Sequence, residues 1–265
     1  MTVRLPQPWL TIATVVKDDL DGFRRTAESL RLQDRDGTEW IVIDSSEERV
    51  STVDLARCEP LASAQVAWTE PRGVYPAMNH ALKRAKGAYI HYLNAGDTYA
   101  DESVVSRLVS ELAARRPTWA YGQVRFIADG GRSVVPPPFD YRRERDLSFS
   151  RGRFPPHQGT IVATETLRSL GGFDPSWRVA ADYATALKLS KIADPLEFPW
   201  LVADFHEGGL STVAWRDSLS EFHRARVGIL RPAGIAAWRE RYEWAAQWSR
   251  MATVRGRAMI RGMGR

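Results

Sequence analysis

The chain has 265 residues, 44% of them hydrophobic and 26% charged, so it can bury a sizeable core without metal or disulfide staples. Its one cysteine, Cys58, excludes an internal disulfide and a thiolate zinc cluster and suits a reducing compartment. No run of about 18 apolar residues is present, and the N-terminus lacks the pattern of a signal peptide. We therefore expect a cytoplasmic protein.

The first half of the chain alternates between β-branched apolar runs and amphipathic stretches with helical spacing. Strands are predicted at residues 10–16, 40–43, 66–68, 88–93 and 119–127, and helices at 20–30, 76–85 and 104–112. This alternation predicts an α/β fold with a largely parallel sheet covered by helices on both faces. Ligands bind such sheets at the carboxyl ends of the strands, and two of those ends carry aspartates, Asp44 and Asp97.

The pattern changes after residue 127. Asp129–Gly131 predicts a hairpin turn, and residues 136–156, rich in Pro and Arg, predict a long loop. Further elements are predicted as a strand at 157–163, a short helix before Gly171, a helix at 181–192 and a strand at 198–205. We expect one globular domain over residues 1–212.

The basic charge of the chain lies in its C-terminal segment. Residues 213–265 contain 11 arginines, no lysine and four acidic residues, a net charge of +7 in a chain that carries +5 overall. Ile235, Trp238 and Tyr242 form an apolar stripe at helical spacing. Basic helices with an aromatic face bind anionic membrane surfaces, and the alternative is a helix packed on the domain with its arginines in water. We predict a separate helical extension over residues 213–265.

Several common motifs are absent. No Walker loop and no Gly-x-Gly-x-x-Gly follows the first strand, which argues against kinases and nicotinamide-dependent dehydrogenases. No Gly-x-Ser-x-Gly elbow is present, which argues against an α/β-hydrolase. The chain also lacks a His-x-x-x-His pair, so we do not expect a zinc site.

Four segments occur in an order that we recognise: TIATVVKDDL, IVIDSS, GVYPAMNHALKRAKGAYIHYLNAGDTY and HQGTIVATETLRSLGGFDPSWRVAADYATALKL. Over about residues 8–212 they resemble family 2 glycosyltransferases, in the branch that builds bacterial cell-surface polysaccharides and glycolipids. The resemblance implies the GT-A fold, a Rossmann-like mixed sheet that is mostly parallel and covered by helices. It also implies inverting transfer of a hexose from a UDP- or GDP-linked sugar to a glycan or glycolipid acceptor.

The resemblance assigns roles to two carboxylates. Asp97, in the turn after a strand, matches the residue that holds Mn²⁺ or Mg²⁺ against the donor's diphosphate, although many relatives have two acidic residues in this turn. Asp182, at the start of a helix, matches the general base that deprotonates the acceptor hydroxyl. The alternatives are an Asx-type turn residue for Asp97 and an ordinary helix N-terminal residue for Asp182.

The other candidates are polar side chains near strand ends and helix starts: donor-binding Thr14, Asp44, Asn79, Lys83 and Asn94, metal-binding His206, and acceptor-side His157 and Gln158. Asp44 resembles the aspartate that accepts a hydrogen bond from the donor's base, and Thr14 resembles a nucleoside contact. Their alternatives are a strand-end turn residue and an ordinary strand residue. Asn79 and Lys83 share one helix face, which can equally be a solvated face, and His206 can equally be a histidine with only a hydrogen-bonding role.

Two other functions stay open at this point. A sugar nucleotidyltransferase carries a Gly-rich segment with Arg and Lys after its first strand, which TVVKDDL does not match. A non-catalytic nucleic-acid-binding protein would use the basic tail, but it would leave the strand-end aspartates without a role. We therefore expect no nucleic acid partner. If the tail binds lipid, the protein is expected at the inner face of the cytoplasmic membrane, where a lipid-linked acceptor would be available.

Overall fold

The computed structural model describes residues 8–47, 64–128, 131–137, 141, 142, 145, 149, 153–206 and 215–262, with the side chains of all of these except 215, 216 and 250–262. The strands are β1 (Leu10–Val16), β2 (Thr38–Asp44), β3 (Ala64–Trp68), β4 (Tyr89–Tyr92), β5 (Thr98–Tyr99), β6 (Trp119–Ile127), β7 (Ser133–Val134), β8 (Thr160–Ala163) and β9 (Leu196–His206). The helices are α1 (Leu20–Arg31), α3 (Val74–Arg84), α4 (Val104–Arg115), α6 (Thr164–Ser169), α7 (Ala181–Ser190), α9 (Trp215–Leu230) and α10 (Ile235–Gly262), with a 3-10 helix η2 (His157–Gly159).

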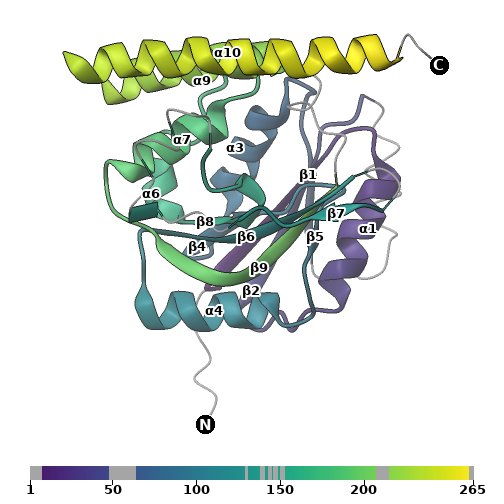
Figure 1. Ribbon diagram of the computed structural model, residues 1–265. Helices are drawn as coiled ribbons and strands as arrows, with labels where there is room; N and C mark the ends of the chain where they lie inside the picture. The colour runs from purple at the N-terminus through teal and green to yellow at the C-terminus, as the bar shows by residue number, and fades with distance from the viewer. Residues whose placement is uncertain are drawn as a thin grey trace.

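All of these strands belong to one mixed sheet, in the order β3-β2-β1-β4-β8-β6-β9-β5, with β7 paired to β6. The first four strands of this order are parallel to one another. β8 runs antiparallel to both of its neighbours, β4 and β6, and β9 is again parallel to β6. The predicted fold class, a mostly parallel mixed sheet covered by helices, is confirmed (Figure 1).

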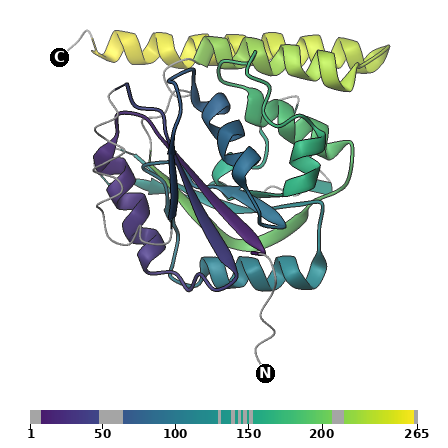
Figure 2. The same ribbon diagram turned by 180° about the vertical axis from the view of Figure 1, so that it is seen from behind.

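Helices cover both faces of the sheet, as Figures 1 and 2 show from opposite sides. α1 and α4 pack on one face through fully buried residues such as Phe23 and Leu108. α3, α6 and α7 pack on the other face, where Met78, Leu167 and Tyr183 are buried. α10 lies across the top of the molecule beside α9 (Figure 1). No described helix has the length and hydropathy that crossing a bilayer requires.

The predicted strands at 10–16 and 119–127 match β1 and β6 residue for residue. The strand predicted at 157–163 is wrong in its first three residues, which form η2 before β8 begins. The Gly159 N–H donates to the Pro156 carbonyl at 3.0 Å and closes this turn. A Cβ on Gly159 would lie 2.5 Å from the Gly122 carbonyl oxygen, so the chain approaches the β6 backbone closely before it extends.

Some predictions fall outside the described residues. The turn residues 129 and 130, several residues of the long loop at 136–156 and the domain boundary at 212–213 are among them. β7 pairs antiparallel with β6, as the predicted hairpin requires. The tail, predicted as a helical extension, contains two helices among its described residues, α9 and α10.

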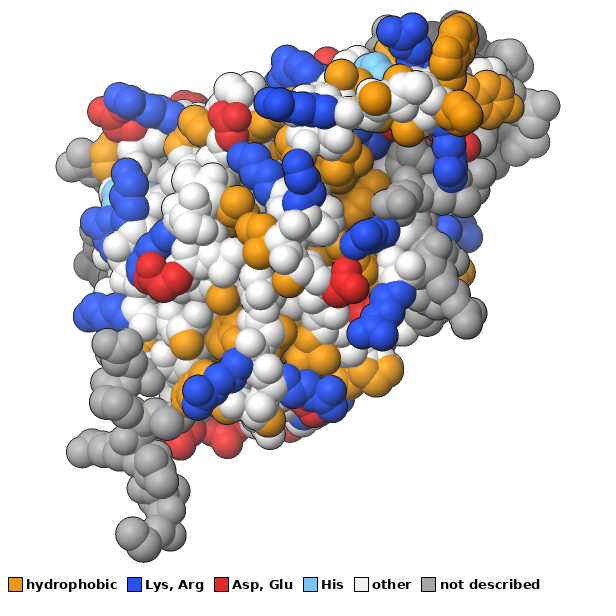
Figure 3. Space-filling model, turned by 90° about the vertical axis from the view of Figure 1, so that its left-hand side faces the viewer, with side chains coloured by type: hydrophobic (Ala, Val, Ile, Leu, Met, Phe, Trp, Pro, Cys, Tyr) orange, Lys and Arg blue, Asp and Glu red, His pale blue; other side chains and the backbone are white. Residues whose placement is uncertain are grey.

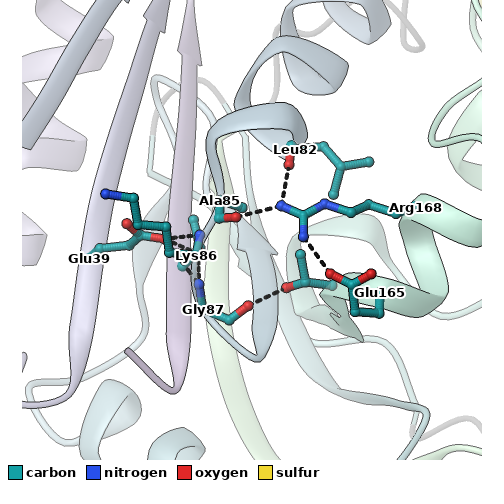
Figure 4. Close-up of polar contacts among 9 residues, drawn as sticks. Glu39, Leu82, Ala85, Lys86, Gly87, Glu165 and Arg168 are labelled. Atoms are coloured by element: carbon teal, nitrogen blue, oxygen red, sulfur yellow. Dashed lines mark hydrogen bonds and ion pairs between the residues drawn. The ribbon is translucent and has the colours of Figure 1, made fainter. Parts of the chain in front are cut away.

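The amino-terminal edge of the parallel strands is closed by a network of polar contacts (Figure 4). The Glu39 carboxylate accepts hydrogen bonds from the Thr11 hydroxyl at 2.6 Å and the Gly87 N–H at 3.1 Å. Arg168 on α6 donates to the Leu82 and Ala85 carbonyls, which end α3 and would otherwise lack partners. This network fixes the junction of α3 with β4 at one edge and leaves the carboxyl ends of the strands, at the other edge, to form the site.

Candidate functional site

A cavity of about 770 Å³ lies at the carboxyl ends of β1, β2 and β9, beside the turn that follows β4. Residues of α1 and its N-cap, the start of α3, η2 and the segment 177–182 also line it. Six of the predicted site residues line it together: Asn94, Asp97, His157, Gln158, Asp182 and His206. The structure therefore brings both predicted catalytic carboxylates to one cavity, at the edge of the sheet where parallel strands present ligand sites.

The turn from Asn94 to Asp97 is held by α1. The Thr26 hydroxyl, which is fully buried, donates to the Asp97 carbonyl at 2.7 Å and accepts from the Gly96 N–H at 3.0 Å. Gly96 has a φ of +96°, a conformation that side chains other than glycine rarely adopt. This turn is therefore fixed to the α/β core, and Asp97 is held with it.

β5 brings Asp97 and His206 together. Thr98 pairs with Asp204 in an antiparallel register, so the residue before β5 lies beside the end of β9. Burial raises the pKa of Asp97 well above its usual range, while a hydrogen bond from the His206 backbone N–H and the positive charge of Arg25 act in the opposite direction. Asp97 is 4% exposed. A carboxylate desolvated to this degree is stabilised by a nearby cation.

The polar atoms around Asp97 suit a hard divalent cation. The Asn94 side-chain oxygen is buried and has no hydrogen-bond partner among the described residues. Oxygen ligands with an occasional imidazole are compatible with Mg²⁺ or Mn²⁺. The described part of the chain contains no group of three His, Cys, Asp or Glu residues that could hold a metal. Asp97, Asn94 and His206 are the cavity-lining side chains that could hold such a cation, with phosphate oxygens and water in the rest of the coordination shell.

Asp182 lies in the first turn of α7. Its carboxylate accepts a hydrogen bond from the Tyr75 hydroxyl at 3.3 Å and another from the Tyr183 backbone N–H at 2.8 Å. Burial raises the pKa of Asp182 to about 6, against these hydrogen bonds, which lower it. A carboxylate with a pKa near 6 is ionised at neutral pH and more basic than an exposed aspartate, which is what a general base requires.

A second cavity, of about 390 Å³, adjoins the first. Asp182, His157 and Gln158 line both cavities. The second cavity is also lined by aromatic and cyclic apolar residues and one cation: Tyr121, Phe126, Pro136, Pro137, Arg153, Phe154, Pro156 and Phe222. Burial lowers the pKa of His157 to about 3, so the ring is neutral, and its Nε2 has no partner among the described residues. Asp182 thus lies where a group in either cavity can reach it.

Three of the predicted donor-binding side chains lie away from the cavity, and their donor-binding roles stay predictions. Thr14 is fully buried, and its hydroxyl accepts from the Trp40 indole N–H at 3.0 Å. The Asn79 amide donates to the Phe173 carbonyl at 2.6 Å and accepts from its N–H at 2.9 Å. Lys83 is exposed in the last turn of α3. None of these three side chains is among the described residues that line the cavity.

Asp44 is fully buried at the end of β2, and its carboxylate accepts from the Ser46 N–H at 2.8 Å. This is the geometry of an Asx turn, the alternative considered from the sequence. Ser45, which follows it, lines the cavity. The donor-binding role of Asp44 stays a prediction.

Asn79→Ala should destabilise the fold by about 2–3 kcal/mol, because it leaves both backbone groups of Phe173 without their partner. Lys83→Ala, on the same helix, should change stability by less than about 0.5 kcal/mol. Urea denaturation of the two variants measures the difference. Unchanged stability of Asn79→Ala would contradict the structural role, and a selective loss of donor affinity would support the donor-binding prediction.

Three cavity-lining cations were not predicted: Lys17, Arg25 and Arg178. Lys17 pairs with Glu47 at 3.3 Å, and Arg178 pairs with Asp217 at 2.7 Å. Arg25, on α1 directly before Thr26, has no ion pair with any described residue. Arg25 has no motif of its own in the sequence. In the structure, the bond between Thr26 and the Asp97 turn packs α1 against the site.

Comparison with known proteins identifies relatives. The family model of glycosyl transferase family 2 matches residues 11–168. Two uncharacterized glycosyltransferases of Mycobacterium tuberculosis, MT1564 and Rv1514c, are each 29% identical over 213 residues, which cover 77% of this chain and 78% of theirs.

Solved structures share the fold. The mannosyltransferase PcManGT from Pyrobaculum calidifontis, in complex with GDP-Man and Mn²⁺, has a TM-score of 0.63 at 19% identity and covers 97% of this chain and 79% of its own. A structure of S. aureus TarS with UDP-GlcNAc has a TM-score of 0.62 at 15% identity, covering 92% of this chain and 72% of its own. The chain spans 40% of the length of another TarS crystal structure, which has a TM-score of 0.61 and 15% identity and covers 83% of this chain.

Proposed function

The chain belongs to glycosyl transferase family 2, and from that premise we propose that it transfers a hexose from a UDP- or GDP-linked sugar to an acceptor hydroxyl, with inversion. One observation carries the proposal: Asp97 and Asp182, held by different elements, line the same cavity. Asp97 is suited to hold a cation that binds the donor's diphosphate. Asp182 is suited to act as the base that deprotonates the acceptor hydroxyl. PcManGT and TarS, which share the fold, were solved with GDP-Man, UDP or UDP-GlcNAc, which supports a nucleotide sugar as donor.

The donor's diphosphate is proposed to lie between Asp97 and Arg25. Asp97, Asn94 and His206 would hold Mg²⁺ or Mn²⁺, which supplies a Lewis acid that neutralises charge on the departing diphosphate. The Arg25 guanidinium has no ion pair among the described residues and supplies a second positive charge. Arginine binds phosphate oxygens through its planar fork of donors.

The acceptor is proposed to approach Asp182 from the second cavity. Its hydroxyl donates a proton to the carboxylate as the oxygen attacks the anomeric carbon, and the Tyr75 hydroxyl holds the carboxylate at 3.3 Å. A single displacement of this kind inverts the anomeric configuration. The aromatic and proline side chains of the second cavity suit the apolar face of a sugar ring or a lipid-linked glycan.

A membrane-bound acceptor is supported by the surface of α10. Ile235 is 88% exposed, Trp238 74% and Tyr242 72%, and the three share one face of the helix. Arg239 and Arg241, which lie between Trp238 and Tyr242 in the sequence, are also exposed. Basic and hydrophobic side chains lie interspersed over the layer at the top of the molecule in Figure 3. An anionic lipid surface would take up both kinds of side chain.

The double substitution Trp238→Ser with Tyr242→Ser should lower the fraction of protein that sediments with anionic vesicles several-fold, because it removes two exposed aromatic anchors. Ile192→Ser removes an exposed apolar residue elsewhere, at 52% exposure, and should bind vesicles like the wild type. Equal sedimentation of all three proteins would contradict membrane association through α10.

A donor screen tests the proposed reaction. Release of nucleoside diphosphate from UDP- and GDP-sugars is measured with Mn²⁺ and with EDTA, and thermal shifts report binding without turnover. Turnover or stabilisation with one donor class, reduced by EDTA, is the expected result. A protein that neither turns over nor is stabilised by any nucleotide sugar would refute the proposal, and pyrophosphate release from a nucleoside triphosphate and a sugar phosphate would indicate a nucleotidyltransferase.

A further inference from the structure

We propose that α9, which lies outside the domain predicted at residues 1–212, completes the active site through Glu221. Glu221 acts as a positioning residue: it holds the segment 177–180 and thereby the orientation of Asp182. The inference rests on the proposed role of Asp182 as the base. It makes the C-terminal segment part of the catalytic unit rather than a membrane anchor alone.

One carboxylate binds three consecutive backbone N–H groups. Glu221 accepts from Arg178 at 3.0 Å, from Val179 at 2.9 Å and from Ala180 at 3.0 Å. Ala180 is the N-cap residue of α7, and it offers no side chain that caps the helix. Glu221 therefore supplies from another helix the anionic acceptor that stabilises the N-terminal end of a helix. Asp182 is two residues further along.

The wall of the cavity beside Asp182 makes further contacts with α9. The Arg178 guanidinium pairs with Asp217 at 2.7 Å. The Arg224 guanidinium lies 4.2 Å from the centre of the Trp177 ring, a cation–π contact. Trp177, Arg178 and Val179 all line the first cavity, and each has a partner on α9. The position of α9 therefore sets the position of this wall.

α9 is anchored independently of Glu221. Arg226, 1% exposed, donates to the Phe149 carbonyl and to the Tyr183 hydroxyl, both at 3.2 Å, and pairs with Glu240 of α10 at 2.6 Å. Removing the Glu221 carboxylate leaves these contacts intact, so α9 should stay in place while the segment 177–180 loses its acceptor. The turn that carries Asp97 should be unaffected, because Thr26 and β5 hold it from elsewhere.

Glu221→Ala tests the inference, with Glu221→Gln as the conservative variant and His223→Ala as the matched control. His223 lies on the same helix, but it contacts Glu240 and Trp244 instead of the segment 177–180. Glu221→Ala should lower kcat on the order of 10- to 100-fold with the donor KM changed by less than about twofold, because misplacing a catalytic group costs rate and not donor binding. Glu221→Gln, which keeps one accepting oxygen, should recover part of the lost kcat, and His223→Ala should keep kcat within about twofold.

Amide hydrogen exchange gives a readout that needs no activity. Peptides covering residues 177–183 should exchange faster in Glu221→Ala than in His223→Ala, while peptides covering 94–99 should be unchanged. Equal exchange in the two variants, or a kcat loss matched by His223→Ala, would overturn the positioning role. If the wild type turns over no nucleotide sugar, the proposed function fails, and the exchange experiment still decides whether Glu221 orders the segment.

Discussion

Replacing Asp182 with asparagine should reduce sugar transfer on the order of 10³-fold while donor binding is retained. The asparagine side chain has nearly the same size and can still accept the hydrogen bond that the Tyr75 hydroxyl gives to Asp182 at 3.3 Å. It cannot take the proton of the acceptor hydroxyl. The rate of nucleoside diphosphate release in the presence of acceptor, and donor affinity by calorimetry, separate the two effects. Transfer within tenfold of the wild type would remove Asp182 as the base.

The same substitution should stabilise the protein at pH 7.5. Burial raises the pKa of Asp182 from 3.8 to about 6, so the folded state favours the protonated form. Its stabilising contribution is present below pH 3.8 and is lost as the pH rises through about 6. Above pH 6 the wild type keeps a poorly solvated charge that asparagine lacks, a difference of about 1–2 kcal/mol after allowance for partial exposure. Melting temperatures should show a larger gain at pH 7.5 than at pH 4.5, because the loss begins above pH 3.8 and is complete only above about 6. In the wild type, kcat should fall below about pH 6 as the base is protonated.

The sequence predicted the parallel half of the sheet well because its signals are local. The run LTIATVV is apolar and β-branched throughout and forms β1, fully buried. Asp97 could be placed for the same reason, since a carboxylate in the turn that follows a buried strand lies at the edge where parallel sheets bind ligands. Both catalytic carboxylates of the resemblance do reach one cavity.

The features that sequence reasoning missed depend on pairing between distant elements. β5 has two residues, too few for any periodicity, yet its register with β9 places His206 beside Asp97. From the sequence, Asn79 is an ordinary polar residue of a helix. Its side chain forms hydrogen bonds with the backbone of Phe173, which lies in a turn far along the chain. Glu221 was one of four acidic residues in a basic tail, and its contact with the start of α7 required α9 to be folded against α7.

Asp97→Asn should abolish the metal dependence of donor binding. With Mn²⁺ the donor Kd of the variant should rise on the order of 10- to 100-fold and approach the value that the wild type shows in EDTA. The variant should fold with at least the stability of the wild type, because burial already disfavours the charged form of Asp97. Binding that persists in the variant is assigned to Arg25 and the remaining cavity wall, and it should be indifferent to EDTA.

Asp101→Asn serves as the control for this result. Asp101 follows β5, whereas Asp97 precedes it; Asp101 is exposed, pairs with Arg107 at 2.7 Å and is not among the cavity-lining residues. Its substitution should leave the donor Kd and its metal dependence unchanged.

In the wild type, the raised pKa of Asp97 means that protons compete with the cation for the carboxylate, so donor affinity with Mn²⁺ should weaken as the pH falls. Asp97→Asn should lose that pH dependence together with the response to EDTA. A variant that still binds donor more tightly with Mn²⁺ than with EDTA would place the cation on other residues, because asparagine at this position carries no charge to hold it.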